Sequence, residues 1–261
     1  MDKIFWGDYT TCEMQGFLER DPVVLIPVGA YEQHGPHLAM NTDKVIAEEL
    51  CRRIVARSET PCVTLPCIWV GISEHHMKFS GSLTLKHSTM ALFLFDILES
   101  LSRSGVGKAL VLNSHGGNMV PLNEALTRAG SSFGGTWALL TYWNLISKEI
   151  RELRASEYGG ISHAGEMETA LQLYLAEENV RRDRLPPANN VKGSSLWSPE
   201  MFAANKISLY QPYDRLSEQG HIGDPRKATA EMGRAVVDLV VEKSLHLVEA
   251  VWKGALLDEH Y

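Results

Sequence analysis

What this 261-residue sequence lacks excludes several classes of protein. It has no apolar run long enough to cross a membrane, and the opening MDKIFWGDYT has no apolar core of an export signal. With a net charge of -7, it has too few basic residues for nucleic acid or an anionic membrane to be the main partner. It also lacks a Walker P-loop, a GxGxxG motif and a GxSxG nucleophile elbow. These absences predict a cytoplasmic protein that binds neither nucleic acid nor membrane.

Cysteine is scarce, and the chain has only Cys12, Cys51, Cys62 and Cys67. No two of them form a CxxC pair, so neither a thiolate metal site nor a tight disulfide framework is indicated. None lies in a cluster with histidine, which argues against a cysteine nucleophile. We expect reduced thiols, as in a cytoplasmic protein.

Short apolar runs alternate with helical patterns along the chain. We expect strands at residues 23–28, 63–68, 109–112 and 137–142, and helices at 44–56, 89–103, 120–129, 145–155, 165–176 and from 225 to about 248. This alternation predicts an α/β protein with a mostly parallel sheet covered by helices on both faces. The length fits a single domain over residues 1–261. Asp224 and Pro225 suit the start of the last helix, and the irregular segment 185–224 suits a functional loop or a subunit-contact arm.

The first candidate cluster follows the expected strand at 23–28. Four polar side chains come soon after its end: Glu32, His34, His37 and Asp43. Ligands of open α/β sheets bind beyond the carboxyl ends of the strands. Glu32 and His34 point the same way if the chain is extended, and Asp43 could return as a third ligand. The alternative is a polar loop with solvated charges.

Two further clusters stand at comparable places. NSHGGN, which contains His115 and Gly117, follows the expected strand at 109–112, and HAGEMETA begins a helix with His163, Glu166 and Glu168. Carboxyl ends of parallel strands share one edge, so the three clusters could converge. Imidazole and carboxylate without thiolate suit Zn, Mn or Fe in a hydrolytic site. Taken singly, each cluster is also compatible with an ordinary hydrogen-bonded loop or helix start. The adjacent histidines His75 and His76 are interpreted as part of an exposed loop.

Four motifs then occur in a fixed order: PVGAYEQHGPHLAMNTD, NSHGGN, HAGEMETA and GHIGDPRKATAEMG. Together they resemble the creatininase (creatinine amidohydrolase) family. The resemblance implies a three-layer α/β/α sandwich, two divalent metal ions per chain (Zn first, with Mn or Fe as alternatives) and hydrolysis of a cyclic or formyl amide C–N bond. It also implies a homo-oligomer, often a hexamer.

Carried over by motif, the resemblance gives metal roles to Glu32, His34, Asp43, His115 and Glu168. Asp43 is the bridging carboxylate, Glu32 and His115 hold one metal, and His34 and Glu168 hold the other. His37 has no ligand role. The sequence departs from creatininase itself at Gly117, where that enzyme has Glu, and at Gly159, where it has Trp. Our hypothesis is that Glu166 replaces the lost acid as a metal ligand or general base.

The expected mechanism has a metal-bridging hydroxide attacking the carbonyl of a small cyclic amide or related small molecule. His163 or Glu166 moves the proton to the leaving atom. The expected substrate-binding residues are Glu74, His75, Gly117 and Trp143. The alternatives are a deformylase of a formamide, a ring-opening hydrolase of a cyclic keto-sugar or inosose, and a non-catalytic metal-binding assembly protein.

Overall fold

The computed structural model describes residues 2–256 and has a four-stranded parallel sheet in the order β2-β1-β3-β4. The strands are β1 Val23–Val28, β2 Cys62–Thr64, β3 Lys108–Asn113 and β4 Thr136–Thr141. β2 is shorter than the expected 63–68, because Pro66 has no N–H for the ladder and Ile68 pairs with Val28 only through an isolated bridge. The other three strands lie close to their expected positions.

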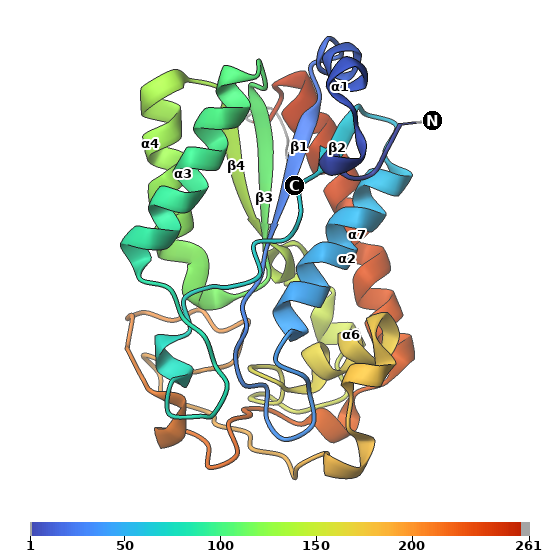
Figure 1. The fold of residues 1–261 in the computed structure, drawn as a ribbon. Helices are drawn as coiled ribbons and strands as arrows, with labels where there is room; N and C mark the ends of the chain where they lie inside the picture. The colour runs from blue at the N-terminus through green and yellow to red at the C-terminus, as the bar shows by residue number, and fades with distance from the viewer. Residues whose placement is uncertain (1, 257–261) are drawn as a thin grey trace.

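Helices cover both faces of this sheet (Figure 1). On one side lie α3 (His87–Arg103) and α4 (Met119–Phe133), and on the other lie α2 (Thr42–Arg57), α6 (Glu166–Leu175) and α7 (Ala230–Lys253). Two shorter helices are α1 (Thr11–Leu18) and α5 (Ile150–Leu153). The predicted α/β sandwich with a parallel sheet is confirmed, while the single domain over 1–261 stays a prediction.

Side chains of the central strands pack alternately into two hydrophobic cores, one on each face of the sheet. In β1, Val24 and Ile26 pack into the core under α3 and α4, and Leu25 packs into the core under α2 and α7. These side chains are fully buried, as expected for a parallel strand covered on both faces. Burial of each such side chain contributes roughly 1.5–3 kcal/mol. The alternation fixes the register of β1, and with it the position of the loop that follows.

The carboxyl ends of the strands point to the lower end of the molecule in Figure 1, where the loops after β1, β3 and β4 gather. The segment 185–224 also runs there and has only a short 3-10 turn, Tyr213–Arg215, as predicted for an irregular segment. α6 begins at the same level. The fold therefore brings the predicted clusters to one end of the sheet.

Two helix predictions were inaccurate. The expected helix at 145–155 is a 3-10 turn, Tyr142–Ile146, followed by the one-turn helix α5. The last helix begins at Ala230, because the Thr229 hydroxyl caps it by accepting the Met232 N–H at 3.1 Å. Pro225 instead begins a separate 3-10 turn.

Candidate metal centre

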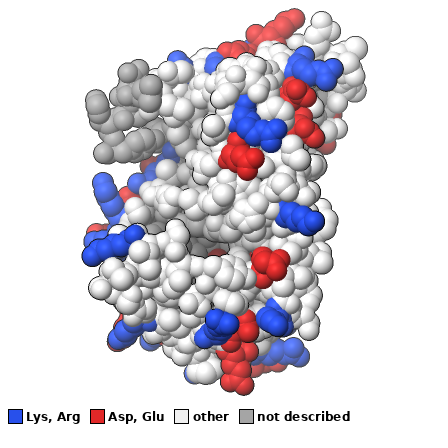
Figure 2. Space-filling view, turned by 90° about the vertical axis from the view of Figure 1, so that its left-hand side faces the viewer, with Lys and Arg blue, Asp and Glu red and all other residues white. Residues whose placement is uncertain are grey.

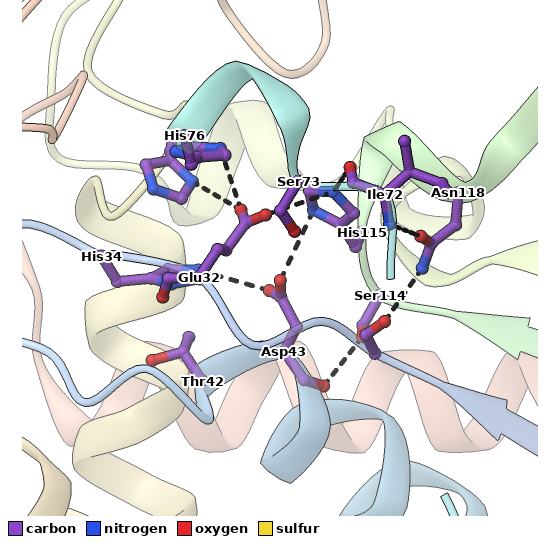
Figure 3. A network of polar contacts seen from close by, with 12 residues as sticks. Glu32, His34, Thr42, Asp43, Ile72, Ser73, His76, Ser114, His115 and Asn118 are labelled. Carbon is purple, nitrogen blue, oxygen red and sulfur yellow. Dashed lines mark hydrogen bonds and ion pairs between the residues drawn. The ribbon is translucent and has the colours of Figure 1, made fainter. Parts of the chain in front are cut away.

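Four of the predicted ligands meet at the carboxyl end of the sheet: Glu32, His34, Asp43 and His115 (Figure 3). Asp43 Oδ1 lies 3.4 Å from His34 Nε2, and Asp43 Oδ2 lies 3.5 Å from His115 Nδ1. Glu32 Oε2 lies 3.3 Å from His115 Nε2. All four side chains are buried. The loop after β1, the first turn of α2 and the loop after β3 thus contribute to one cluster.

A glycine and a hydroxyl place Asp43 in this cluster. A Cβ on Gly29 would lie 2.6 Å from the backbone nitrogen of Lys44, so the absence of a side chain lets α2 begin against the end of β1. The Ser114 hydroxyl donates to the carbonyl oxygen of Asp43 at 2.8 Å. The start of α2 is therefore fixed between β1 and the residue after β3.

Several atoms of the cluster have no hydrogen-bond partner although they are buried: Glu32 Oε1 and Oε2, His34 Nε2 and Asp43 Oδ2. A buried carboxylate without hydrogen bonds or a counter-charge is costly, by several kcal/mol. Oxygen and imidazole nitrogen are the ligands that Zn, Mn and Fe accept. The residues present therefore fit divalent metal ions.

The backbone decides which nitrogen of two imidazoles can bind a metal. His34 Nδ1 lies 3.0 Å from the Glu32 carbonyl oxygen, and His115 Nε2 lies 2.8 Å from the Ile72 carbonyl oxygen. A carbonyl can only accept, so these nitrogens carry the protons. His34 Nε2 and His115 Nδ1 then face Asp43, with the orientation usual for metal-ligating histidine.

The electrostatics of the cluster favour positive charge. Burial alone would lower the pKa of His34, but the carboxylates of Asp43, Glu168 and Glu32 together outweigh it and raise the pKa to about 10. Burial alone would raise the pKa of Glu32, but His115 and His76 hold it well below its ordinary value. Burial raises the pKa of Glu168 to about 7. A metal cation would take the place of the proton on His34.

HAGEMETA brings two more residues to the cluster. Ligand atoms of His34, His163 and Glu168 lie within 4.8 Å of one another. Glu168 accepts the backbone N–H of Ala164, a residue with a left-handed φ of 52°. Such a conformation is strained for alanine and is found most often at functional sites. Ala164 lies in the turn between His163 and α6, and the side chains of His163 and Glu168 on either side of it both reach the cluster.

A cavity of about 460 Å³ opens over this cluster. Its lining includes Glu32, His115, His163 and Glu168 from the cluster, and three predicted substrate-binding residues, His75, Gly117 and Trp143. The segment 185–224 supplies the other side, with Trp197, Met201, Leu209, Tyr210, Tyr213 and Leu216. Among the described residues that line the cavity, none is lysine or arginine.

The Creatininase family model, described as creatinine amidohydrolase, matches residues 7–248. The chain belongs to the creatininase family. It is a hydrolase, since its relatives are amidohydrolases and peptidases. The family and its relatives favour this hydrolase over the alternative of a non-catalytic metal-binding assembly protein.

Three curated relatives of this chain differ in the substrates that their names give. The chain is 30% identical over 219 residues to the "Mycofactocin precursor peptide peptidase" of Mycolicibacterium smegmatis, covering 82% of this chain and 79% of that one. It is 25% identical over 265 residues to the "Creatinine amidohydrolase" of Pseudomonas putida, covering 92% and 94%. It is 23% identical to the "3-dehydro-scyllo-inosose hydrolase" of Thermotoga maritima, covering 69% and 58%.

Solved creatininase structures share the fold. One described as "Creatininase Mn" has a TM-score of 0.78 at 25% identity and covers 96% of this chain and 99% of that one. A mutant described as the "Zn-Zn type" has a TM-score of 0.81 at 24% identity and covers 97% and 99%. The low identities agree with the prediction that this family member is not creatininase itself.

Gly117 gives a structural reason for one departure from creatininase. A Cβ at Gly117 would lie 2.2 Å from the carbonyl oxygen of Ile72, which itself accepts from His115. A glutamate cannot occupy this backbone without a shift of the loop that orients His115.

Two predicted site residues lie elsewhere. Glu166 is buried, but its carboxylate accepts the backbone N–H groups of Ala155 at 2.7 Å and Ser156 at 3.0 Å. It holds the turn before HAGEMETA and does not line the cavity, so the hypothesis of a ligand or general base lacks the required geometry. Glu74 is exposed and also outside the cavity lining, because neighbouring side chains of its 3-10 turn point apart.

Sequence reasoning missed His76 and Gln33. His76 was expected in an exposed loop, but it is fully buried, with Nε2 3.1 Å from Glu32 Oε1. Gln33 contacts both His76 and His163. The adjacent pair His75-His76 was a signal for the site, but only the packing of the 71–86 loop decides which ring is fully buried beside Glu32.

Proposed function

We propose that this creatininase-family hydrolase is a binuclear metal-dependent amidohydrolase that cleaves the C–N bond of an uncharged amide. One observation carries the proposal: the two oxygens of Asp43 face two different imidazoles, at 3.4 Å from His34 and 3.5 Å from His115. A carboxylate in this arrangement is suited to bridge two metal ions. The proposed ligands are Glu32 and His115 for one ion and His34 and Glu168 for the other.

Zinc is the metal we propose first, with manganese or iron as alternatives, in two ions per chain. The imidazole and carboxylate ligands suit all three, and solved relatives are described as Mn and Zn-Zn types. Divalent ions held by such ligands polarise a carbonyl group and make water acidic enough to act as a nucleophile near neutral pH.

His163 is the residue we propose for proton transfer. Its Nε2 donates to the Gln33 carbonyl oxygen at 2.6 Å, which leaves the lone pair on Nδ1. Nδ1 lies 3.6 Å from Glu32 Oε1, at the floor of the cavity. It can take a proton from the attacking water and deliver it to the leaving nitrogen. With Glu166 bound to the backbone, His163 is the better candidate of the two that the sequence offered.

The cavity supports an uncharged substrate with apolar groups. Its volume of about 460 Å³ lies in the range that holds drug-sized ligands, and is larger than a single small ring requires. Because no described lining residue is lysine or arginine, the cavity offers no ammonium or guanidinium group to bind a phosphate or carboxylate. Trp143, Trp197 and Leu209 offer apolar surface near the metal ligands. His75 and Gly117 are proposed as further substrate contacts.

A small cyclic amide and an internal peptide bond both meet these requirements. The peptide is the second candidate, favoured by the volume of the cavity and by peptidase relatives of 29–30% identity. The test is a substrate panel with metal-loaded and chelator-treated protein: lactams including creatinine, formamides, end-blocked peptides and cyclic ketoses. Metal-dependent cleavage of a lactam or blocked peptide supports the proposal. Turnover confined to ketoses, or turnover without metal, would contradict it.

We also propose a homo-oligomer, possibly a hexamer, located in the cytoplasm. Figure 2 shows the face of α3 and α4, where charged side chains are sparse across the middle. Four large apolar side chains on these helices are exposed: Leu92 at 47%, Phe93 at 48%, Met119 at 39% and Val120 at 67%. Apolar groups gathered in this way favour an interface between copies of the chain. Four free thiols agree with a reducing compartment, and within residues 2–256 no helix is both long and apolar enough to span a membrane.

A further inference from the structure

Backbone groups fix the orientation of the Gln33 side-chain amide. Gln33 Oε1 accepts the Gly35 N–H at 2.9 Å, and Gln33 Nε2 donates to the Gly220 carbonyl oxygen at 2.9 Å. An N–H can only donate and a carbonyl can only accept, so the amide cannot be turned over. Gly35 and Gly220 are far apart in the sequence, and both contacts require the same orientation of the amide.

This orientation decides the protonation of one His76 nitrogen. The second hydrogen of the Gln33 amide points to His76 Nδ1, which lies 2.8 Å from Gln33 Nε2. His76 Nδ1 must therefore accept, and the ring carries its proton on Nε2. That atom is buried and lies 3.1 Å from Glu32 Oε1, which is within hydrogen-bond distance, although the angle of the contact is outside that of a hydrogen bond.

Spacing alone would indicate a different role. Ligand atoms of Glu32, His76 and His163 lie within 4.8 Å of one another, as in a three-ligand metal site. A nitrogen that carries a proton has no lone pair for a metal. The Gln33 amide fits only beside a glycine at position 220, because the φ of Gly220 is 87° and a Cβ there would lie 1.9 Å from Gln33 Oε1. The late GHIGDP motif thus leaves room for the amide.

We infer that Gln33 holds His76 as an N–H donor to Glu32, so that His76 positions this carboxylate and is not itself a metal ligand. The inference rests on the proposed function, in which Glu32 binds metal. It assigns Gln33 and His76 as positioning residues. Outer partners of this kind orient ligating carboxylates, and their loss typically weakens metal affinity about 10–100-fold.

The first test is nitrogen NMR of the metal-free protein with isotope-labelled histidine, with His76 assigned by comparison with His76→Gln. The inference expects a protonated, pyrrole-type signal for Nε2 and an unprotonated, pyridine-type signal for Nδ1. The opposite pattern, or two protonated signals, would overturn it. This measurement does not depend on whether metal binds, so its outcome is separate from that of the proposed function.

The second test loads the wild type, His76→Ala and His76→Gln with cadmium and compares cadmium NMR and binding titrations. His76→Ala should keep the same number of bound ions and lose about 10–100-fold in affinity for one of them. His76→Gln offers an amide N–H in place of Nε2–H and should retain most of that affinity. Loss of one ion in both variants, or cadmium coupling to His76 in the wild type, would overturn the inference.

Discussion

Asp43 Oδ2 and His115 Nδ1 lie 3.5 Å apart, although one residue belongs to the first turn of α2 and the other follows β3. Two long-range contacts make this approach possible: Gly29 lets α2 begin against β1, and Ser114 binds the Asp43 carbonyl. Asp43 and His115 therefore approach each other because β1 and β3 are parallel neighbours. Asp43 Oδ2 is one of the two oxygens with which this carboxylate is proposed to bridge two metal ions.

Asp43→Asn should remove both metal ions and lower kcat/KM by roughly 10³-fold or more, since ligands that act as a unit are lost together. Metal analysis after dialysis and steady-state kinetics check this. Asp96→Asn, an exposed acid on α3, is the matched control and should behave as wild type. An Asp43 variant that keeps two ions and a normal rate would refute the bridging role.

Chelation should abolish turnover and lower the melting temperature, because ions that bind only the folded protein stabilise it, and without them the buried Glu32 and Asp43 carboxylates have only imidazoles as counter-charges. Adding zinc or manganese at about 100 times its Kd should restore roughly 2.7 kcal/mol of stability by mass action. Thermal unfolding with and without metal measures the effect. Asp43→Asn should not respond to added metal. An equal metal response in the two proteins would place the stabilising ion elsewhere.

His163→Ala should reduce kcat by about 10²–10⁴-fold, the range typical of a lost general acid–base residue. Metal content measured in parallel separates loss of proton transfer from loss of a ligand. If His163→Ala keeps both ions and a wild-type kcat, proton transfer belongs to another group.

Glu166→Gln should affect stability and leave kcat within a few-fold of wild type. The carboxylate holds the N–H groups of Ala155 and Ser156, and weakening such buried hydrogen bonds costs about 1–3 kcal/mol. Denaturant unfolding measures the first effect and steady-state kinetics the second. A loss of kcat comparable to that of His163→Ala, with unchanged stability, would restore Glu166 as a catalytic candidate.

Gly117→Ala should destabilise the protein by roughly 1–3 kcal/mol and weaken metal binding, because the new methyl group would meet the Ile72 carbonyl and the His115 ring. Gly116→Ala is the control, since nothing lies within 4 Å of its added Cβ. Unfolding and metal titration of both variants check the difference. Equal stability and affinity would show that the loop adjusts freely, and that a glutamate could stand there.

Phe93→Glu should dissociate the proposed oligomer, because it places a charge in the apolar surface of α3 and α4. Sedimentation velocity of wild type and variant measures the association state. Glu99→Lys changes charge on another exposed part of α3 and should not alter the assembly. A monomeric wild type, or an oligomer unaffected by Phe93→Glu, would contradict the proposed interface.

The sequence by itself determined the sheet and most of the candidate ligands. Buried apolar runs such as Val23–Val28 are local signals, and parallel strands necessarily bring their carboxyl ends to one edge. Glu32, His34 and Asp43 could therefore be predicted from their distance to a strand end, and His115 in the same way. Helix ends near residues 145–155 and 225–230 were less predictable, because capping and short 3-10 turns decided them.

Only the tertiary structure decided between residues of equal chemical type. Glu166 and Glu168 lie two positions apart on one helix, yet one holds a backbone turn and the other reaches the metal cluster. His75 and His76 are neighbours that both line the cavity, yet only the His76 ring is fully buried, with Nε2 3.1 Å from Glu32 Oε1. In each case the direction of a side chain depends on what packs against it from a distant segment, here the turn at Ala155–Ser156 and the amide of Gln33. Those long-range contacts cannot be predicted from the neighbouring residues in the sequence.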